Sequence, residues 1–320
     1  MTNKEIYQRT IKFSIYRLIY DILAFAILAV LSIGGFFLAE TTIENGLLGL
    51  GIGILAGLIV IGIMMRYVSY MFKAGQIAMM TEAITTGELP DDVVGAGKKV
   101  VKERFATIAI FRAATGVVKG IFNELGKAIS GVGKAVGGEK GETVGSVINS
   151  AIQVVVDYLS DCCLGWIFYR KDVNAAKATC EGAVLFFKHG KTLARNLGRV
   201  FGMGAASLLA IGGVFSGIFY AIASQFPAFF NELAGVIAED AEGKIAIFLS
   251  DPAHLTIAAA VLGGVIIWTI IHGAFVRPFV LTGVLRNYLE SGMDEVPDES
   301  SFSMLDGKSK KFAELHTQIG

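Results

Sequence analysis

Four long apolar runs, each bordered by basic residues, constrain the fold of this chain more than any other feature. They cover residues 13–39, 46–65, 201–224 and 255–276. A helix needs about 20 apolar residues to cross the roughly 30 Å hydrocarbon layer of a bilayer, and each run reaches that length. Hydrophobic residues form 53% of the chain and are concentrated in these runs, so the sequence predicts an all-α polytopic helical membrane protein.

Charge divides between the two ends of these predicted spans. The two connecting loops, 40–45 and 225–254, are mainly acidic, whereas basic residues border the opposite ends of the spans. These basic residues are Lys4, Arg9, Lys12, Arg17, Arg66, Lys73, Lys188, Lys191, Arg195, Arg199, Arg277 and Arg286. The positive-inside bias then places both termini and the long middle segment in the cytoplasm. Acidic outer loops and free cysteines suit a bacterial inner membrane.

The sequence LSIGGFF at 31–37 returns as LAIGGVF at 209–215. Leu31 matches Leu209, and Arg17 matches Arg195, by the same offset of 178 residues. Each copy closes on glycine followed by Pro-Asp, in TTGELPDD (85–92) and ESGMDEVPDE (290–299), a pattern that stops helices. We interpret this as a duplication that gives two parallel-repeat hairpins: a first repeat at 1–94, a middle at 95–171, a second repeat at 172–299 and a cytoplasmic tail at 300–320.

Small residues at four-residue spacing predict close packing of helices within the membrane. They form three rows in the predicted spans: Gly49, Gly53 and Gly57; Gly213, Gly217 and Ala221; Ala260 and Gly264. Outside the bilayer, we expect amphipathic cytoplasmic helices at 67–86 and 173–200. The lipid bilayer and its anionic head groups on the cytoplasmic face are the expected partners of their basic residues.

The middle segment leaves two alternatives open. Residues 105–126 and 146–168 are each long enough to cross a bilayer, but both carry charges, and a glycine-rich connector joins them. Either they lie on the cytoplasmic surface as amphipathic helices, which gives four spans, or they form a third hairpin, which gives six.

A candidate polar network lies in this middle segment. In a spanning hairpin, Arg112 would meet Asp161 and Lys119 would meet Asp157 at comparable depth. Charges at such depth are costly unless they are paired, and intramembrane ionisable residues are functional candidates by default. Aromatic residues near these carboxylates suit an organic cation, although aromatic residues also gather at membrane interfaces without a ligand.

Asp21 and His272 are secondary candidates, because both lie within predicted spans. Asp21 is one helical turn after Arg17, which favours a simple ion pair, and a lone buried histidine favours a structural hydrogen bond over a proton relay.

The sequence contains no pattern typical of catalysis, a cofactor or a metal site. The four histidines are scattered, the glycine-rich connector lacks the P-loop spacing, and Cys162, Cys163 and Cys180 have no metal-ligand spacing. We therefore expect free thiols, and neither an enzyme, a cofactor nor a metal. The chain carries 28 basic and 28 acidic residues, and nucleic acid is not an expected partner.

Residues 161–202 resemble part of the choline-transporter-like membrane proteins. The similarity rests on a cysteine-bearing segment, on Asn174 with Ala175, on a changed form of an Ala-x-x-Gly-x-x-x-Phe stretch at 181–186, and on Asn196 with Arg199 and Val200. The N-terminal half does not share it. The resemblance implies transport of organic cations, and it assigns no binding residue.

Two functions follow as expectations. The first is a transporter or channel for small solutes or organic cations, which the duplication and the charged middle favour. The alternative is a non-catalytic scaffold that binds partners through its cytoplasmic amphipathic helices, which the scarcity of polar residues in the four spans favours. Homo-oligomerisation is a further expectation for either function.

Overall fold

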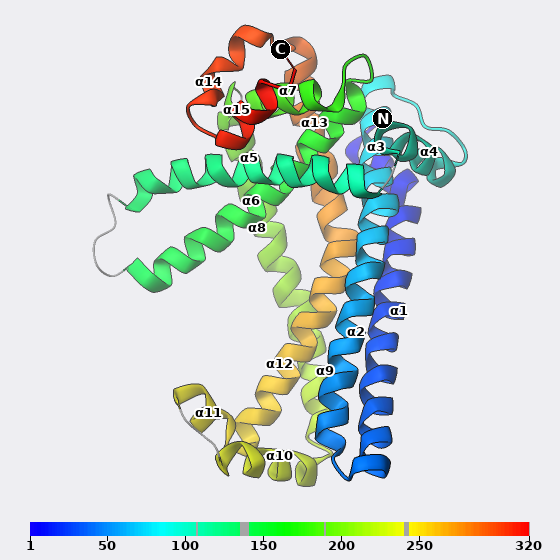
Figure 1. Ribbon diagram of the computed structural model, residues 1–320, viewed down its shortest axis with the longest axis vertical. Helices are drawn as coiled ribbons and strands as arrows, with labels where there is room; N and C mark the ends of the chain where they lie inside the picture. The colour runs from blue at the N-terminus through cyan, green and yellow to red at the C-terminus, as the bar shows by residue number, and fades with distance from the viewer. Residues whose placement is uncertain (107, 135–140, 189, 240–242, 320) are drawn as a thin grey trace. The chain divides into compact units, whose positions relative to one another are not determined.

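A computed structural model describes residues 1–106, 108–134, 141–188, 190–239 and 243–319, which form helices and no strand (Figure 1). The chain divides into two compact units. The first contains Met1–Leu197 and Pro278–Gly320, and the second contains Gly198–Arg277.

Four helices in the described part of the chain are long and apolar enough to cross a membrane: Asn3–Ile43, Leu48–Thr86, Arg199–Ala223 and Pro252–Asp294. Each overlaps one of the four predicted runs, and the helices Asn3–Ile43 and Pro252–Asp294 extend beyond their runs at both ends. The all-α class and the four apolar helices are therefore confirmed.

The first hairpin joins α1 (Asn3–Ile43) to α2 (Gly46–Val68). A capping box starts α1, because the Thr2 hydroxyl accepts from the Glu5 backbone N–H while the Glu5 carboxylate accepts from the Thr2 backbone N–H. The Thr-x-x-Glu spacing in the sequence indicates this start, but the predicted first run begins only at residue 13.

Glycines bring α1 and α2 into close contact. A Cβ atom on Gly49 would overlap the carbonyl oxygen of Gly35, and one on Gly53 would overlap the carbonyl oxygen of Leu31. The row of Gly49, Gly53 and Gly57 therefore faces α1, as its spacing predicts. The two backbones are so close that no larger side chain fits at Gly49 or Gly53. The contact therefore leaves no room for a polar pathway.

The second span continues beyond the apolar layer. A π-helical turn, η1 (Ser69–Lys73), links α2 to α3 (Ala74–Thr86). The sequence predicts a surface helix at 67–86, and this prediction is wrong for α3. This helix continues the second span, and most of its residues are buried. Its end matches the sequence: Gly87 caps α3 with a φ of 78°, a conformation that glycine adopts without strain.

A helical core forms around α3. We use this name for α3, α7 (Ala175–Lys188), α13 (Arg277–Asp294), α15 (Lys310–His316) and the C-terminal half of α6 (Gly141–Tyr169). Thr282 on α13 donates to the Met80 sulfur on α3, and Tyr288 donates to the Gly182 carbonyl on α7 at 2.5 Å. Residues from both halves of the sequence thus build one core.

The predicted surface helix at 173–200 is divided between two elements, since α7 ends at Lys188 and α8 (Gly190–Ser207) follows. Its first part is inside the helical core rather than on a surface, because Cys180, Glu181 and Val184 are almost fully buried. The predicted stop at ESGMDEVPDE is confirmed, since α13 ends at Asp294, but its glycine is not the cap. Gly292 lies within α13, where a Cβ would press against the Trp166 ring, so packing and not capping requires this glycine.

The middle segment has a sharp bend. Helix α4 (Val93–Phe105) ends before Ala106, and α5 (Ile108–Lys134) leaves at 80° to it. In Figure 1, α5 runs across the axis of α1 and α2. It contacts η1 and the helical core. The α4 and α5 pair would add a fifth span only if it crossed as one bent segment. The predicted hairpin of 105–126 and 146–168 is not among the four apolar helices.

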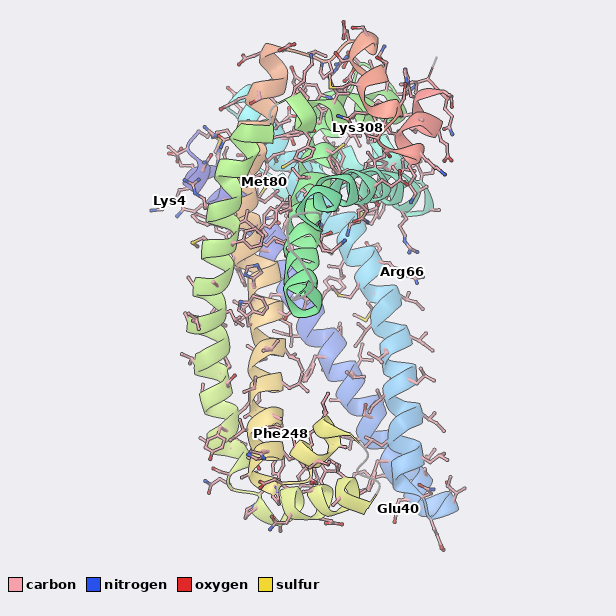
Figure 2. All side chains as sticks on the ribbon, turned by 90° about the vertical axis from the view of Figure 1, so that its left-hand side faces the viewer. Lys4, Glu40, Arg66, Met80, Phe248 and Lys308 are labelled. Carbon is pink, nitrogen blue, oxygen red and sulfur yellow. The ribbon has the colours of Figure 1, made fainter. Side chains whose placement is uncertain are left out.

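Figure 2 shows how the first unit is arranged along its length. Glu40 marks the turn between α1 and α2, whereas Lys4 and Lys308 lie at the opposite end with the helical core, and Arg66 lies between. Arg286 donates to the carbonyl oxygen of Met1, which holds the N-terminus beside α13. The start and the tail of the chain therefore share one end of this unit.

The second unit contains the other hairpin. Its elements are the end of α8, a π-helical turn η2 (Leu208–Gly212), α9 (Gly213–Ala223), α10 (Pro227–Glu239), α11 (Lys244–Leu249), α12 (Pro252–Ile271) and a further π-helical turn η3 (His272–Val276). The expected acidic loop is partly helical. Phe230, Ala234 and Leu255 form a small apolar cluster between α10 and α12.

The repeated IGG sequence packs differently in its two copies. Gly264 meets Ser216 and the Gly212 carbonyl oxygen, whereas Gly213 and Gly217 face away from α12. The expected contact row of Gly213, Gly217 and Ala221 is therefore wrong for this hairpin. The turn η2 ends at Gly212, and a π-helical turn changes the rotational phase of the residues that follow it.

The glycine contact of the first hairpin is testable. Gly49→Ala should lower stability by about 1–3 kcal/mol, because its Cβ overlaps the facing backbone. Gly51→Ala is the matched control, since nothing lies within 4 Å of its Cβ position. Thermal unfolding of both variants in the same detergent measures the difference, and equal melting temperatures would contradict this packing.

Candidate functional site

Two of the four predicted network residues form an ion pair. Lys119 on α5 lies 2.7 Å from Asp157 on α6, and their side chains are 50% and 37% exposed. Water can reach both groups, so this pair resembles a surface salt bridge, which contributes up to about 1 kcal/mol.

Asp161 has a different partner from the one expected. Its carboxylate lies 2.6 Å from the Lys73 ammonium in η1, and only 5% of the Asp161 side chain is exposed. The expected partner, Arg112, is exposed and forms no ion pair within the described ranges. Arg112 and Asp161 therefore lie near each other without forming an ion pair. The ion pair between Lys73 and Asp161 connects α6 to the second span.

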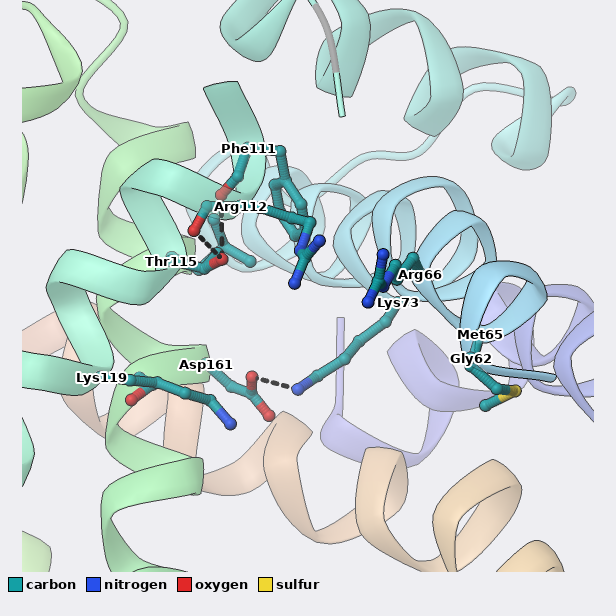
Figure 3. Close-up of a pocket in the computed structure, with 11 residues that line it drawn as sticks. Gly62, Met65, Arg66, Lys73, Phe111, Arg112, Thr115, Lys119 and Asp161 are labelled. Atoms are coloured by element: carbon teal, nitrogen blue, oxygen red, sulfur yellow. Dashed lines mark hydrogen bonds and ion pairs between the residues drawn. The ribbon is translucent and has the colours of Figure 1, made fainter. Parts of the chain in front are cut away.

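Three of the four predicted network residues, Arg112, Lys119 and Asp161, border a cavity of about 320 Å³, which we call the basic pocket (Figure 3). Four basic side chains reach it from α2, η1 and α5: Arg66, Lys73, Arg112 and Lys119. Asp161 is the acidic residue in its lining, and Thr115 and Ser160 add hydroxyl groups. Part of the wall is apolar, formed by Gly62, Met65, Phe111 and Leu164. Positive charge therefore predominates, which favours an anionic ligand and disfavours an organic cation.

The two secondary candidates have structural partners. Asp21 lies 3.9 Å from Arg17, one turn away on α1. In the second unit, His272 Nδ1 lies 3.0 Å from the Ser207 hydroxyl oxygen, which also accepts from the Trp268 indole N–H at 3.0 Å. Both arrangements agree with the structural roles that their positions favour.

Sequence reasoning did not find the polar cluster around Glu181. Its carboxylate is buried and accepts from the Trp166 indole at 3.0 Å and from Arg170 at 2.7 Å. Burial raises the pKa of Glu181, against the opposing effects of the Trp166 hydrogen bond and the Arg170 charge. Arg170 also pairs with Asp172. This cluster ties α6 to α7 inside the core.

Cys162, Cys163 and Cys180 are free and fully buried in the same core. Burial raises the pKa of the Cys180 thiol to about 12 and raises the pKa of Cys163 further. Such thiols stay protonated and unreactive. Within the described part of the chain, no group of His, Cys, Asp and Glu side chains could hold a metal ion.

Comparisons with known proteins give no relative for this chain. No family model, curated protein or solved structure matches it. The geometry of the described residues is therefore the basis for the functional argument.

The two ion pairs should differ in energy. Asp161→Asn leaves a partly buried Lys73 without its carboxylate, so it should destabilise by roughly 3 kcal/mol. Asp157→Asn is the matched control and should cost less than about 1 kcal/mol. Thermal unfolding in detergent measures both, and a smaller loss for Asp161→Asn than for Asp157→Asn would contradict the burial of this pair.

The raised pKa of Glu181 predicts a pH dependence. The native state holds the proton more tightly than the unfolded state, so this group's stabilising contribution is present below the ordinary pKa of 4.5 and falls as pH rises through the native value. The free energy of unfolding of the wild type, relative to Glu181→Gln, should therefore decrease as pH increases above about 4.5. Unfolding at a series of pH values measures this difference, and a rise with pH would show that the carboxylate is stabilised instead.

Proposed function

We propose that this protein is a multi-pass membrane scaffold whose hairpins hold the helical core at the cytoplasmic face of the membrane. The observation that carries this proposal is the separation of polar and apolar contacts. Within the first unit, the buried Asp161 and Glu181 carboxylates belong to the helical core, while α1 and α2 meet through glycine and apolar contacts. A dry hairpin suits an anchor and offers no polar lining for a solute.

The charge pattern supports the cytoplasmic orientation. Lys4 and Lys308 lie at the end of the first unit that carries the core, Arg66 lies between the two ends, and acidic Glu40 lies at the other end. This asymmetry follows the positive-inside bias. A bacterial inner membrane is the compartment that we propose on the same pattern.

Two π-helical turns support the proposed duplication. The second span of each repeat contains one, at η1 and at η3, and each is followed by a helix that ends near the Pro-Asp sequence of its repeat. Parallel duplication would supply the core with two corresponding helices, α3 and α13, one from each repeat.

Transport of organic cations is the weaker candidate. Arg112, Lys119 and Asp161, the residues expected to bind the solute, line a pocket that has four basic groups and one carboxylate. Repulsion between like charges therefore disfavours a cationic solute. The proposed scaffold is not an enzyme, and its partners are the bilayer and a protein bound by the core.

A labelling experiment tests the orientation. Glu44→Cys and Glu88→Cys introduce exposed thiols at opposite ends of the first unit, while the native cysteines are buried. A membrane-impermeant maleimide should label Glu44→Cys in intact cells and Glu88→Cys only after permeabilisation. Labelling of Glu88→Cys from outside would contradict a cytoplasmic core.

The same two positions separate a scaffold from a transporter. A photo-crosslinking residue at Glu88 should give a discrete protein adduct in cells, and one at Glu44 should not. In proteoliposomes, choline uptake should equal that of protein-free vesicles. Protein-dependent uptake without an adduct from Glu88 would favour the transporter and reject the scaffold.

A further inference from the structure

Two guanidinium groups of the basic pocket pair with no carboxylate among the residues that the structure describes. Lys73 and Lys119 are paired with Asp161 and Asp157, but Arg66 and Arg112 form no ion pair in the described part of the chain. Figure 3 shows both arginines directed into the same space as Lys73 and Asp161. The pocket therefore keeps unneutralised positive charge after its internal ion pairs are formed.

Arginine matches one class of ligand particularly well. Its planar guanidinium presents parallel N–H donors that bind phosphate oxygens in a bidentate manner. Two such groups, with the Lys73 and Lys119 ammonium groups nearby, form a cluster typical of phosphate recognition. The Thr115 and Ser160 hydroxyl groups already donate to backbone carbonyl oxygens of their own helices, so the charged side chains are the donors that would meet the phosphate.

The apolar wall distinguishes a lipid phosphate from a free one. Gly62 lies one turn before Arg66 on α2, and nothing lies within 4 Å of its Cβ position. The same stretch of α2 exposes Ile59 and Ile63, at 59% and 61%. Side chains four residues apart share a helix face, so an acyl chain beside Gly62 would bring its head group to Arg66.

The position of the pocket along the first unit agrees with this ligand. Arg66 is two residues before the end of α2 at Val68, and α5, which carries Arg112 and Lys119, contacts η1 directly after that end. Figure 1 shows α5 crossing near this end of α2. Phosphate groups of a bilayer lie just outside the hydrocarbon layer, where basic residues attract anionic lipids.

We propose that the basic pocket binds the phosphate group of an anionic phospholipid, with Arg66 and Arg112 as its principal ligands. Lys73 and Lys119 raise the local potential, and the apolar wall accepts the start of an acyl chain. The bound lipid would join α2 to α5 and so fix the core against the membrane. This inference rests on the proposed membrane scaffold and adds the class of lipid that it recognises.

The test uses the full chain purified in a mild detergent. Short-chain phosphatidylglycerol, short-chain phosphatidylcholine and inorganic phosphate are titrated separately, and bound ligand is measured by native mass spectrometry and thermal shift. Phosphatidylglycerol should bind and raise the melting temperature. Phosphatidylcholine should bind at least about tenfold more weakly, because its choline group cancels the phosphate charge.

A charge-matched pair of variants tests the residues. Arg66→Gln with Arg112→Gln should weaken phosphatidylglycerol binding by at least about tenfold, since two charge-assisted contacts are lost. Lys99→Gln with Lys102→Gln removes the same charge from the exposed face of α4, outside the pocket, and should leave binding unchanged.

The other outcomes each overturn the proposal. Equal binding of inorganic phosphate would assign the pocket to a soluble anion. Equal binding of phosphatidylcholine, binding that survives the double arginine variant, or no binding by the wild type would show that the pocket does not select an anionic lipid. These results are independent of the crosslinking and choline assays, so the pocket and the scaffold can fail separately.

Discussion

Hydrocarbon offers no hydrogen-bond partner to a polypeptide backbone, and the rest of this structure depends on that constraint. Each apolar run must be helical through its whole length, because every N–H and C=O group needs a partner within its own segment. The helices then have no hydrophobic reason to associate, so contact between α1 and α2 relies on the close approach that Gly49 and Gly53 permit. Polar side chains have little place in such a contact, and they gather beyond it.

The helical core forms where the spans leave the apolar layer. The second span continues through η1 into α3, and α3 meets α6 and, through Met80 and Thr282, α13. Lys73 lies at this transition and pairs with the buried Asp161. A buried carboxylate without this partner would be costly, so the ion pair makes the position of α6 depend on the end of α2. Deeper in the core, Glu181 performs the same linking role between α6 and α7 through Trp166 and Arg170.

These contacts place a dry anchor and a polar core in one chain. In the proposed scaffold, an anchoring role would account for the scarcity of polar groups in the four apolar runs, and the core would account for the charges of the middle segment. The basic pocket lies beside the end of α2, which contributes Gly62, Met65 and Arg66, and α5 contributes Phe111 and Arg112. The proposed anionic lipid has both apolar and charged parts, and its binding would strengthen the attachment of α5 to α2.

The sequence by itself determined the helical class, the four apolar helices, the close glycine contact of the first hairpin, the free thiols and the Gly87 cap. These features depend on local composition or on spacing within one helix, which a single sequence displays directly. Some local signals were present and overlooked, as with the Thr2 and Glu5 capping box. Only the tertiary structure decided that Asp161 pairs with Lys73, that Gly292 makes room for Trp166, and that Gly212 rather than Gly213 faces α12. Each of these depends on the rotation of one helix against another, and π-helical turns such as η2 change that rotation without a recognisable pattern in the sequence.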